Sequence, residues 1–169
     1  MDRKEIILVD EKDNQIGTGE KLQVHLKGRL HRAFSIFLFN SRGETLVQQR
    51  AKTKYHSAGL WSNSCCSHPG PDESLKQATQ RRLKEELGIK CFLKEIFSFI
   101  YRVNLGNLIE YEFNHVFIGE FSGDPKPNKK EVQDWEWVTP RELKKDIREN
   151  PEKYSYWFKL ILAKVLSSK

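Results

Sequence analysis

The sequence predicts a single α+β domain, and three observations support that fold class. Short apolar or alternating runs predict strands, and longer amphipathic runs predict helices. The strands follow one another in hairpin-like pairs and do not alternate regularly with helices, which disfavours a doubly wound sheet. The 169 residues contain no repeat, low-complexity tract or linker, so we expect one domain over residues 1–169 with its own core.

The expected strands are separated by turn signals such as Asn40-Ser41-Arg42-Gly43 and Gly123-Asp124-Pro125. Strands are predicted at Ile6–Val9, Phe34–Phe39, Thr45–Gln48, Phe92–Ile100, Tyr111–Phe117 and Trp135–Val138. Helices are predicted at Ser74–Leu87, Pro140–Glu149 and Ser155–Leu166. In the aromatic cluster around the start of the last helix, we expect Tyr154 and Phe158 to belong to the core.

The middle predicted helix carries charged residues on its apolar side. Ser74 and Gln77 form a capping box at its start, and Gly88 is a natural stop. At about 100° per residue, Arg82 and Glu86 fall inside the apolar sector. Charges in that sector must pair or face a ligand, because unpaired burial is costly. Since the two residues are four apart, an internal salt pair is the alternative to a ligand site.

The charge balance favours an anionic ligand. Lys and Arg total 29 against 23 Asp and Glu, which gives a net charge of +6. A positive charge suits small anions and nucleic acids equally well. The basic residues are spread along the chain, however, and no aromatic-basic RNA-reading motif is present. We therefore expect a small anionic ligand and no nucleic-acid partner.

Cysteine usage and apolar runs bear on location. Cys65, Cys66 and Cys91 are an odd set without the spacing of a disulfide framework. Met1–Glu5 is not followed by an apolar run of signal-peptide length, and no run approaches the ~20 residues that cross a bilayer. We expect a reduced, cytoplasmic protein that does not insert into membranes and is a monomer.

The segment Ser62–Pro69 is typical of an active-site loop. It places Cys66 two residues before His68, and a thiol near an imidazole can exchange its proton near neutral pH. The alternative is a buried structural cysteine beside a surface histidine. Cys65 should point away from its neighbour if the loop is extended, and we expect it to be a buried, small apolar residue.

A pair of carboxylates lies in one of the predicted strands. Glu110 and Glu112 are two residues apart, so both emerge on one face of the strand, while His115 points to the other and is excluded as their partner. On a core-facing surface the two carboxylates would repel each other without a cation. The alternative is a solvated acidic strand.

The loop and the helix after it resemble a Nudix box. The matching positions are Glu73, Arg81, Glu85, Glu86 and Gly88. Ser67 stands where Nudix hydrolases have the opening glycine, and Arg82 where they have the glutamate after the arginine. Together with Asn63–Pro69, Arg29–Ser35 and Glu110–Glu112, the chain resembles type 1 isopentenyl-diphosphate isomerases from about residue 21 to residue 157. The resemblance implies a Nudix-like α/β/α sandwich with a mixed sheet.

The resemblance also implies two metal sites. It assigns one divalent transition metal, zinc or manganese, to His25, His31, His68, Glu110 and Glu112. Imidazole and carboxylate ligands suit such a metal. His56 has no counterpart in that site, and we expect it to be an ordinary loop residue. Glu86, with the backbone carbonyl of Cys66, would hold a magnesium ion that arrives with a diphosphate.

The implied substrate is a small diphosphate. By the resemblance, the diphosphate binds Lys21, Arg50, Lys54 and Arg82. Four converging cations suit such a group, although any one of these residues taken alone is ordinarily a solvated surface charge. The implied activity is the interconversion of isopentenyl diphosphate and dimethylallyl diphosphate in isoprenoid biosynthesis.

Moving a double bond by one position requires adding a proton at one carbon and removing another proton two bonds away, through a tertiary carbocation. By the resemblance, Cys66 and Glu112 transfer these protons. Tyr101 would hydrogen-bond near the glutamate, and Trp157 would lie over the cationic carbon. We expect Glu112, with Tyr101, to deliver the proton and Cys66 to remove the other, but the resemblance leaves this assignment open.

Two other functions fit parts of the sequence. A Nudix diphosphate hydrolase shares the fold and the magnesium ion, but it needs several box glutamates, and Arg82 replaces one of them. A metal-stabilised binding module for phosphorylated ligands would explain the histidines and basic residues, but it gives Cys66 no task.

Overall fold

The computed structural model describes residues 4–168, and Met1–Arg3 and Lys169 lie outside the described residues. Most of the Met1–Glu5 segment, on which the expected location partly rests, therefore falls outside this range. The strands are β1 (Glu5–Val9), β2 (Gln15–Glu20), β3 (His31–Phe39), β4 (Thr45–Arg50), β5 (Trp61–Ser62), β6 (Cys65–Ser67), β7 (Leu93–Leu105), β8 (Leu108–Glu120) and β9 (Val132–Val138). The helices are α1 (Lys21–Lys27), α2 (Leu75–Leu87), α3 (Pro140–Glu149) and α4 (Tyr156–Ser167), with a 3-10 turn η1 (Pro151–Lys153).

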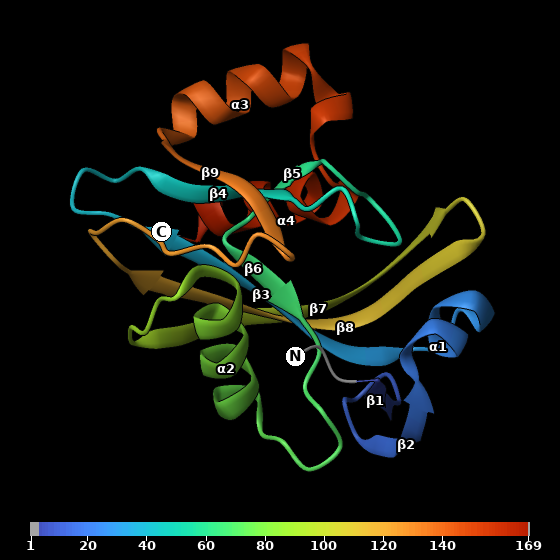
Figure 1. Ribbon diagram of the computed structural model, residues 1–169. Coiled ribbons are helices and arrows are strands. Elements are labelled where there is room, and N and C mark those ends of the chain that lie inside the picture. Colours follow the sequence, from blue (N-terminus) through green and yellow to red (C-terminus); the bar gives the residue numbers. More distant parts are fainter. Residues whose placement is uncertain (1–3, 169) are drawn as a thin grey trace.

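Strand β3 lies at the centre of a mixed sheet (Figure 1). It pairs antiparallel with β1, β4 and β6, and parallel with β8 over its whole length. Strands β7 and β8 form a long antiparallel hairpin, and β4 pairs with β5 and β9. Strands and helices do not alternate regularly, which confirms the predicted α+β class.

Helices α2 and α4 cover opposite faces of this sheet (Figure 1). Because side chains alternate along a strand, β3 presents Phe34, Ile36 and Leu38 to the core formed with α2. It presents Phe37 and Phe39 to the second core, formed with α4. Each fully buried side chain of this kind contributes about 1.5–3 kcal/mol. The two cores give the expected α/β/α sandwich.

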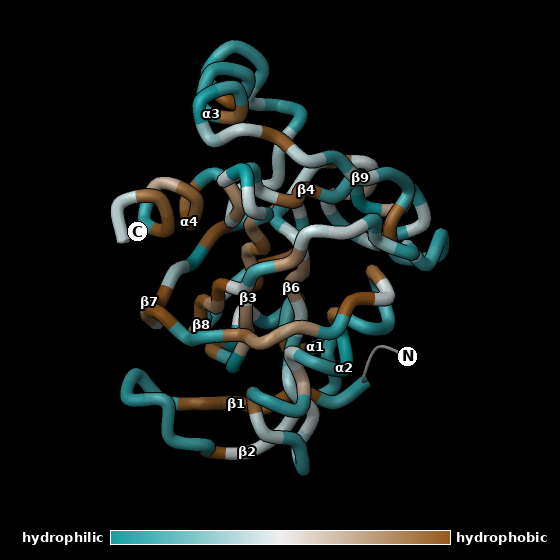
Figure 2. Tube along the Cα trace, turned by 90° about the vertical axis from the view of Figure 1, so that its left-hand side faces the viewer, coloured by the Kyte–Doolittle hydropathy of each residue, from teal (hydrophilic) through white to brown (hydrophobic). Residues whose placement is uncertain are grey.

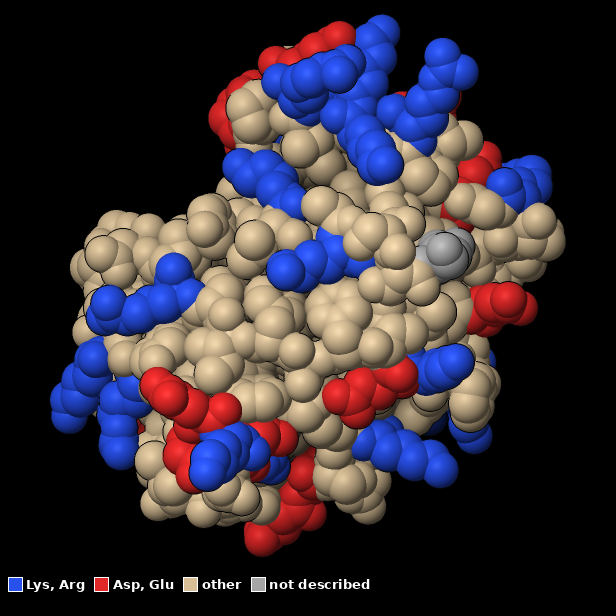
Figure 3. Space-filling view, turned by 180° about the vertical axis from the view of Figure 1, so that it is seen from behind, with Lys and Arg blue, Asp and Glu red and all other residues tan. Residues whose placement is uncertain are grey.

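Helix α3 lies outside the sandwich, at the edge of the molecule (Figure 1). Its bounds match the prediction, and Leu143 is its buried residue. Figure 2 shows that α3 is largely hydrophilic, whereas α4 carries a hydrophobic stretch. From behind, Lys and Arg side chains gather over α3 while the middle of the face is mostly uncharged (Figure 3). None of the helices within residues 4–168 is both long and apolar enough to traverse a bilayer.

The signals at the ends of α2 act as predicted. The Ser74 hydroxyl accepts a hydrogen bond from Gln77 N at 3.2 Å, and the Gln77 side chain accepts one from Ser74 N at 2.9 Å. Gly88 ends the helix in the left-handed conformation, at φ 67°. These contacts satisfy backbone groups that a helix end otherwise leaves without partners.

The sequence pattern missed β2, α1, β5 and β6, and it made the central hairpin too short. Strand β7 runs to Leu105 and β8 begins at Leu108, because the turn between them contains Gly106 at φ 67°. The longer β8 contains Glu110 as well as Glu112.

Helix α1 is short, but both of its ends are fixed. The Glu20 carboxylate accepts hydrogen bonds from Leu22 N at 3.1 Å and Gln23 N at 2.9 Å. Gly28 ends the helix at φ 60°. A Cβ atom at Gly28 would lie 2.8 Å from Ile109 Cδ1 of β8, so the helix end approaches that strand closely. The glycine therefore places α1 directly beside the carboxylates of β8.

Candidate active site

A pocket opens where α1, the sheet, the start of α4 and the loop between β4 and β5 meet. Its lining includes ten of the residues predicted for the site: Lys21, Arg50, Lys54, Cys66, His68, Arg82, Tyr101, Glu110, Glu112 and Trp157. The three others lie buried beside it: His25, His31 and Glu86. The remaining lining residues are Phe34, Ser35, Tyr55, His56, Ser67 and Asn114.

The register of the central strands sets the two carboxylates in this pocket. Glu110 and Glu112 are only 3% and 7% exposed, so the alternative of a solvated acidic strand is wrong. The parallel pairing of β3 with β8 puts His31 opposite Glu112. His115 lies on the other face of β8, where it contacts Glu95 at 2.6 Å and Asp13 at 3.0 Å. It is therefore separated from Glu110 and Glu112, as predicted.

Three histidines surround these carboxylates. His25 Nε2 lies 3.3 Å from Glu110 Oε2, and His68 Nε2 and His31 Nε2 lie 3.5 and 3.9 Å from Glu112 Oε1. The Nδ1 atoms of His25 and His31 contact backbone carbonyl oxygens at 2.6 and 2.9 Å. These contacts turn both Nε2 atoms towards the acidic side chains, an arrangement that metal-binding histidines use.

This group fits a divalent cation. The potential ligand atoms of His25, His31, His68 and Glu110 lie within 4.8 Å of one another, and all four residues are buried. Among the described residues, the Nε2 atoms of the three rings and Glu110 Oε2 have no hydrogen-bond partner. Buried polar atoms without partners are costly, and a metal ion would satisfy them together. The cluster can therefore hold a divalent metal ion.

Burial and mutual charge shift the pKa values in this cluster. Burial lowers the pKa of His31 to about 3 and also lowers the pKa of His68, so both rings are neutral, the form that binds metals. Burial, followed by the charge of Glu112, raises the pKa of Glu110 to about 7. Burial alone would raise the pKa of Glu112, but the polar contact with the His68 side chain outweighs it and holds that pKa below its usual range.

Two proton-carrying groups lie beside the carboxylates. The Tyr101 hydroxyl donates to Glu112 Oε2 at 2.9 Å, and Asn114 Nδ2 donates to the same oxygen at 2.8 Å. Cys66 Sγ contacts Asn63 Oδ1 at 2.9 Å. Burial raises the pKa of the Cys66 thiol to about 12, so the thiol is protonated at neutral pH.

Strand β6 separates the two adjacent cysteines. Its pairing with β3 sends Cys66 to the pocket and Cys65 to the core formed with α2, where it is fully buried. This confirms the expected apolar role of Cys65. The alternative of a structural cysteine beside a surface histidine is wrong, because His68 is buried and Cys66 lines the pocket.

Trp157 forms one wall of the pocket from the first turn of α4. The side chain is 4% exposed. The Arg50 guanidinium lies 5.1 Å from the centre of its ring, close enough for a cation–π interaction. Tyr154 and Phe158 lie in the core against the sheet, as predicted.

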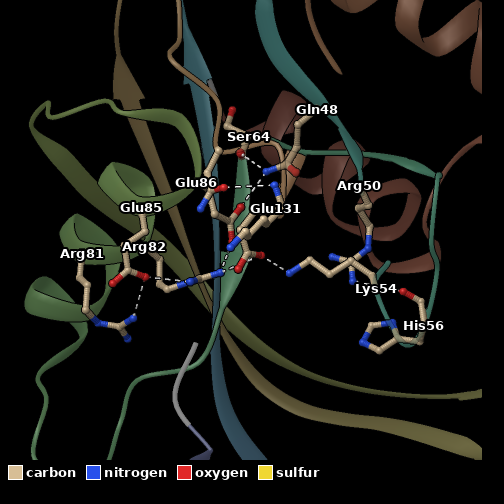
Figure 4. A network of polar contacts seen from close by, with 12 residues as sticks. Gln48, Arg50, Lys54, His56, Ser64, Arg81, Arg82, Glu85, Glu86 and Glu131 are labelled. Carbon is tan, nitrogen blue, oxygen red and sulfur yellow. Dashed lines mark hydrogen bonds and ion pairs between the residues drawn. The ribbon is translucent and has the colours of Figure 1, made fainter. Parts of the chain in front are cut away.

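A network of ion pairs surrounds Arg82 (Figure 4). Its guanidinium contacts Glu85 at 2.8 Å, Glu86 at 2.6 Å and Glu131 at 3.4 Å. Lys54 also pairs with Glu131. The internal salt pair proposed as an alternative is therefore present, on a side chain that also lines the pocket. Sequence reasoning missed Glu131, which follows two lysines in a loop and belongs to no motif.

His56 is not the ordinary loop residue that we expected. Its Nε2 atom lies 3.2 Å from Glu110 Oε1, and its ring meets Trp157 edge-on with 5.7 Å between centres. Burial, followed by the charge of Arg50, lowers the pKa of His56 to about 3. The backbone path of the loop brings this residue into the pocket. The available signal was its place two residues after Lys54.

Comparisons with known proteins identify the family. The model of the NUDIX domain matches residues 29–158. Isopentenyl-diphosphate Delta-isomerase 2 of Photorhabdus laumondii is 53% identical over 158 residues, which cover 93% of this chain and 89% of that protein. Isopentenyl-diphosphate Delta-isomerase 2 of Aromatoleum aromaticum is 51% identical over 164 residues, covering 96% of this chain and 87% of that protein.

Solved structures agree with the fold at much lower identity. The crystal structure of DR0079 from Deinococcus radiodurans has a TM-score of 0.80 and 20% identity, covering 95% of this chain and 98% of that one. MutT protein from Methanosarcina mazei has a TM-score of 0.65 and 21% identity, covering 80% and 91%. These likenesses confirm the Nudix-like fold alone. Because the two isomerases share about half of their residues with this chain over nearly their full length, the chain, with its NUDIX domain, belongs to the isopentenyl-diphosphate Delta-isomerase family.

Proposed function

We propose that this protein interconverts isopentenyl diphosphate and dimethylallyl diphosphate, through a tertiary carbocation, in isoprenoid biosynthesis. The observation that carries the proposal is the meeting of a thiol, a carboxylate with a tyrosine hydroxyl, and an indole ring in one largely buried pocket rimmed by cations. The names of the relatives support the same reaction.

The reaction needs one group that donates a proton and one that accepts a proton, in a site that excludes water. We assign these transfers to Cys66 and Glu112. With the pKa directions described above, the thiol holds its proton and the carboxylate lacks one, so this state has one donor and one acceptor. After one turnover the proton lies on Glu112 and not on Cys66. This opposite distribution is the starting state for the reaction in the other direction. Delivery of the proton by Glu112 requires the reverse state, in which the carboxyl group carries the proton and the thiol lacks it, while the Tyr101 hydroxyl orients the Glu112 side chain through its hydrogen bond.

We assign the transition metal to His25, His31, His68, Glu110 and Glu112. The orphaned ring nitrogens and the short distances between ligand atoms support the three histidines and Glu110, and Glu112 Oε1 lies 3.5 and 3.9 Å from the Nε2 atoms of His68 and His31. A bound divalent ion would supply a fixed positive charge that offsets the repulsion between the carboxylates. Zinc and manganese both suit imidazole and carboxylate ligands.

We assign the substrate diphosphate to Lys21, Arg50, Lys54 and Arg82, which all line the pocket. A magnesium ion bound by Glu86 would accompany it and supply charge neutralisation. Lys54 and Arg82 both contact Glu131. Binding of the diphosphate therefore requires these two cations to exchange a carboxylate partner for phosphate oxygens. We also propose a single domain over residues 1–169, a monomer, and a location in the cytoplasm.

One assay separates this proposal from its rivals. Isopentenyl diphosphate is incubated with the protein in deuterated water, and the products are analysed by mass spectrometry and phosphorus NMR. An isomerase incorporates deuterium into the hydrocarbon and leaves the diphosphate intact. A hydrolase would release phosphate without labelling the carbon chain, and a binding module would change neither. Either of these last two outcomes refutes the proposed function.

A further inference from the structure

We propose that His56 is a positioning residue, which orients the Glu110 carboxylate for metal binding and thereby links the metal site to the loop between β4 and β5. The proposal rests on the metal site of the proposed function. One Glu110 oxygen, Oε1, lies 3.2 Å from His56 Nε2, while the other, Oε2, lies 3.3 Å from His25 Nε2. The carboxylate is thus held on one side, with its second oxygen directed into the histidine cluster.

The geometry separates His56 from the metal ligands themselves. Among the described residues, the potential ligand atoms of His25, His31, His68 and Glu110 lie within 4.8 Å of one another, whereas His56 approaches Glu110 through Oε1, the oxygen that does not face His25. Residues that do not bind a metal themselves often donate a hydrogen bond to a carboxylate that does, and so fix the orientation of that carboxylate. His56 is suited to this task because its Nε2 atom faces Glu110.

The same residue contacts the substrate side of the pocket. Its backbone carbonyl accepts a hydrogen bond from Arg50 Nη2 at 3.2 Å, and its ring packs edge-on against Trp157 and against Tyr55. Lys54 precedes it by two residues and lines the pocket. Figure 4 shows Arg50, Lys54 and His56 on this stretch of chain. Fixing Glu110 therefore also fixes the stretch that carries two of the diphosphate-binding cations.

The test uses the full chain, freed of metal, and calorimetric titration with Mn²⁺ alone. We compare the wild type with His56→Leu, which removes the donor, and His56→Gln, whose amide nitrogen can take the place of Nε2. His115→Leu is the matched control, because the His115 side chain is similarly exposed, at 10% against 12% for His56, and pairs with two carboxylates on the opposite face of β8. Circular dichroism checks folding. If the leucine variant does not fold, His56→Asn, whose amide is too short to reach Glu110, replaces it.

We expect His56→Leu to bind one Mn²⁺ per chain with affinity reduced roughly 10- to 100-fold, the usual effect of losing an outer hydrogen-bond partner. His56→Gln should recover most of this loss, and His115→Leu should bind as the wild type does. Unchanged affinity in His56→Leu would overturn the proposal. Loss of the site altogether would also overturn it, because His56 would then be a ligand. A glutamine variant as weak as the leucine variant would rule out the hydrogen bond as the cause.

Hydrogen exchange tests the link to the loop. Four amides of the loop, those of Ala51, Lys54, Gly59 and Leu60, donate to backbone carbonyls. Mn²⁺ should slow their exchange in the wild type and in His115→Leu, but much less in His56→Leu at metal saturation. Equal protection in all three chains would refute the link. If the wild type binds no Mn²⁺, the proposed metal site itself is refuted. If the wild type binds Mn²⁺ and His56→Leu binds it equally well, only the proposed role of His56 is refuted.

Discussion

Replacement of Trp157 tests whether the indole ring stabilises the cationic intermediate. The side chain is almost fully buried in the pocket wall, and its ring already interacts with the Arg50 guanidinium at 5.1 Å. Trp157→Leu removes the aromatic face, and Trp157→Phe keeps a smaller one. A neutral alkene gains little from the negative face of a ring, whereas a carbocation gains a charge–quadrupole attraction. The change therefore acts mainly on the chemical step.

The structure sets the expected sizes of the two effects. A desolvated cation over an indole ring gains about 2 kcal/mol, and about 1.36 kcal/mol corresponds to a tenfold change in rate. Trp157→Leu should therefore reduce kcat by about 30-fold, and Trp157→Phe by only a few-fold. The loss of the Arg50 contact, worth about 0.5–1 kcal/mol at a more exposed site, should raise KM about two- to fivefold, because Arg50 is a proposed diphosphate ligand.

The assay is steady-state isomerisation of isopentenyl diphosphate by both variants. Thermal unfolding accompanies it, because truncating a buried tryptophan costs up to about 3–5 kcal/mol of stability, and rates must be compared where every chain is folded. If the leucine and phenylalanine variants are equally active, or if the whole loss appears in KM, then Trp157 only fills space. Its role towards the cation would then have to be abandoned.

Further predictions concern the thiol, the metal and the fold. Cys66→Ala should abolish turnover while the chain still binds diphosphate, whereas Cys65→Ala should remain active. Because proton-transfer groups contribute about 10²- to 10⁴-fold to the rate, more than about a tenth of wild-type turnover in Cys66→Ala would contradict the role of Cys66. Elemental analysis should show that His68→Ala and Glu110→Ala each lose the tightly bound metal. Metal removal should lower the melting temperature of the wild type, because binding stabilises the folded state. Full activity in a chelator that leaves magnesium free would refute the need for the transition metal. Ser74→Ala should lower the free energy of unfolding by about 1 kcal/mol with kcat unchanged, and an unchanged urea midpoint would show that the capping box of α2 does not stabilise the chain.

The sequence predicts elements where local pattern and tertiary packing agree. Strand β3 is buried along nearly all of its length, and its second half, Ile36–Phe39, is a continuous apolar run, so its existence was evident from the sequence. Helix α3 has both a capping threonine, Thr139, and a proline at its first position, and its predicted bounds match the structure. Such signals act over one or two turns of chain and need no knowledge of distant residues.

Strand β2 and helix α1 escaped prediction for a physical reason. The segment Gln15–Glu20 contains Gly17 and Gly19, and Ile16, its large apolar residue, is exposed. Its strand form depends on pairing with β1, which a local pattern does not reveal. Helix α1 has only 7 residues, too few to be stable without packing against β8.

The histidines of the pocket also differ in whether the sequence could place them there. His25, His31 and His68 could be placed through the family resemblance, because their neighbours form recognisable motifs. His56 belongs to no such motif, and its contact with Glu110 arises because the loop between β4 and β5 brings it into the pocket. Contacts of this kind join residues distant in sequence through the backbone path of the loop, so no periodicity announces them.

The parallel pairing of β3 with β8 has a consequence for the order in which the protein is assembled. His31 and Glu112 face each other only when these two strands lie side by side. During synthesis the three histidines leave the ribosome well before the carboxylates of β8, and non-local parallel pairing is intrinsically slow. A nascent chain therefore cannot hold the proposed transition metal with all of its ligands until the central strands have joined. Full ligation of the metal therefore has to follow the pairing of β3 with β8.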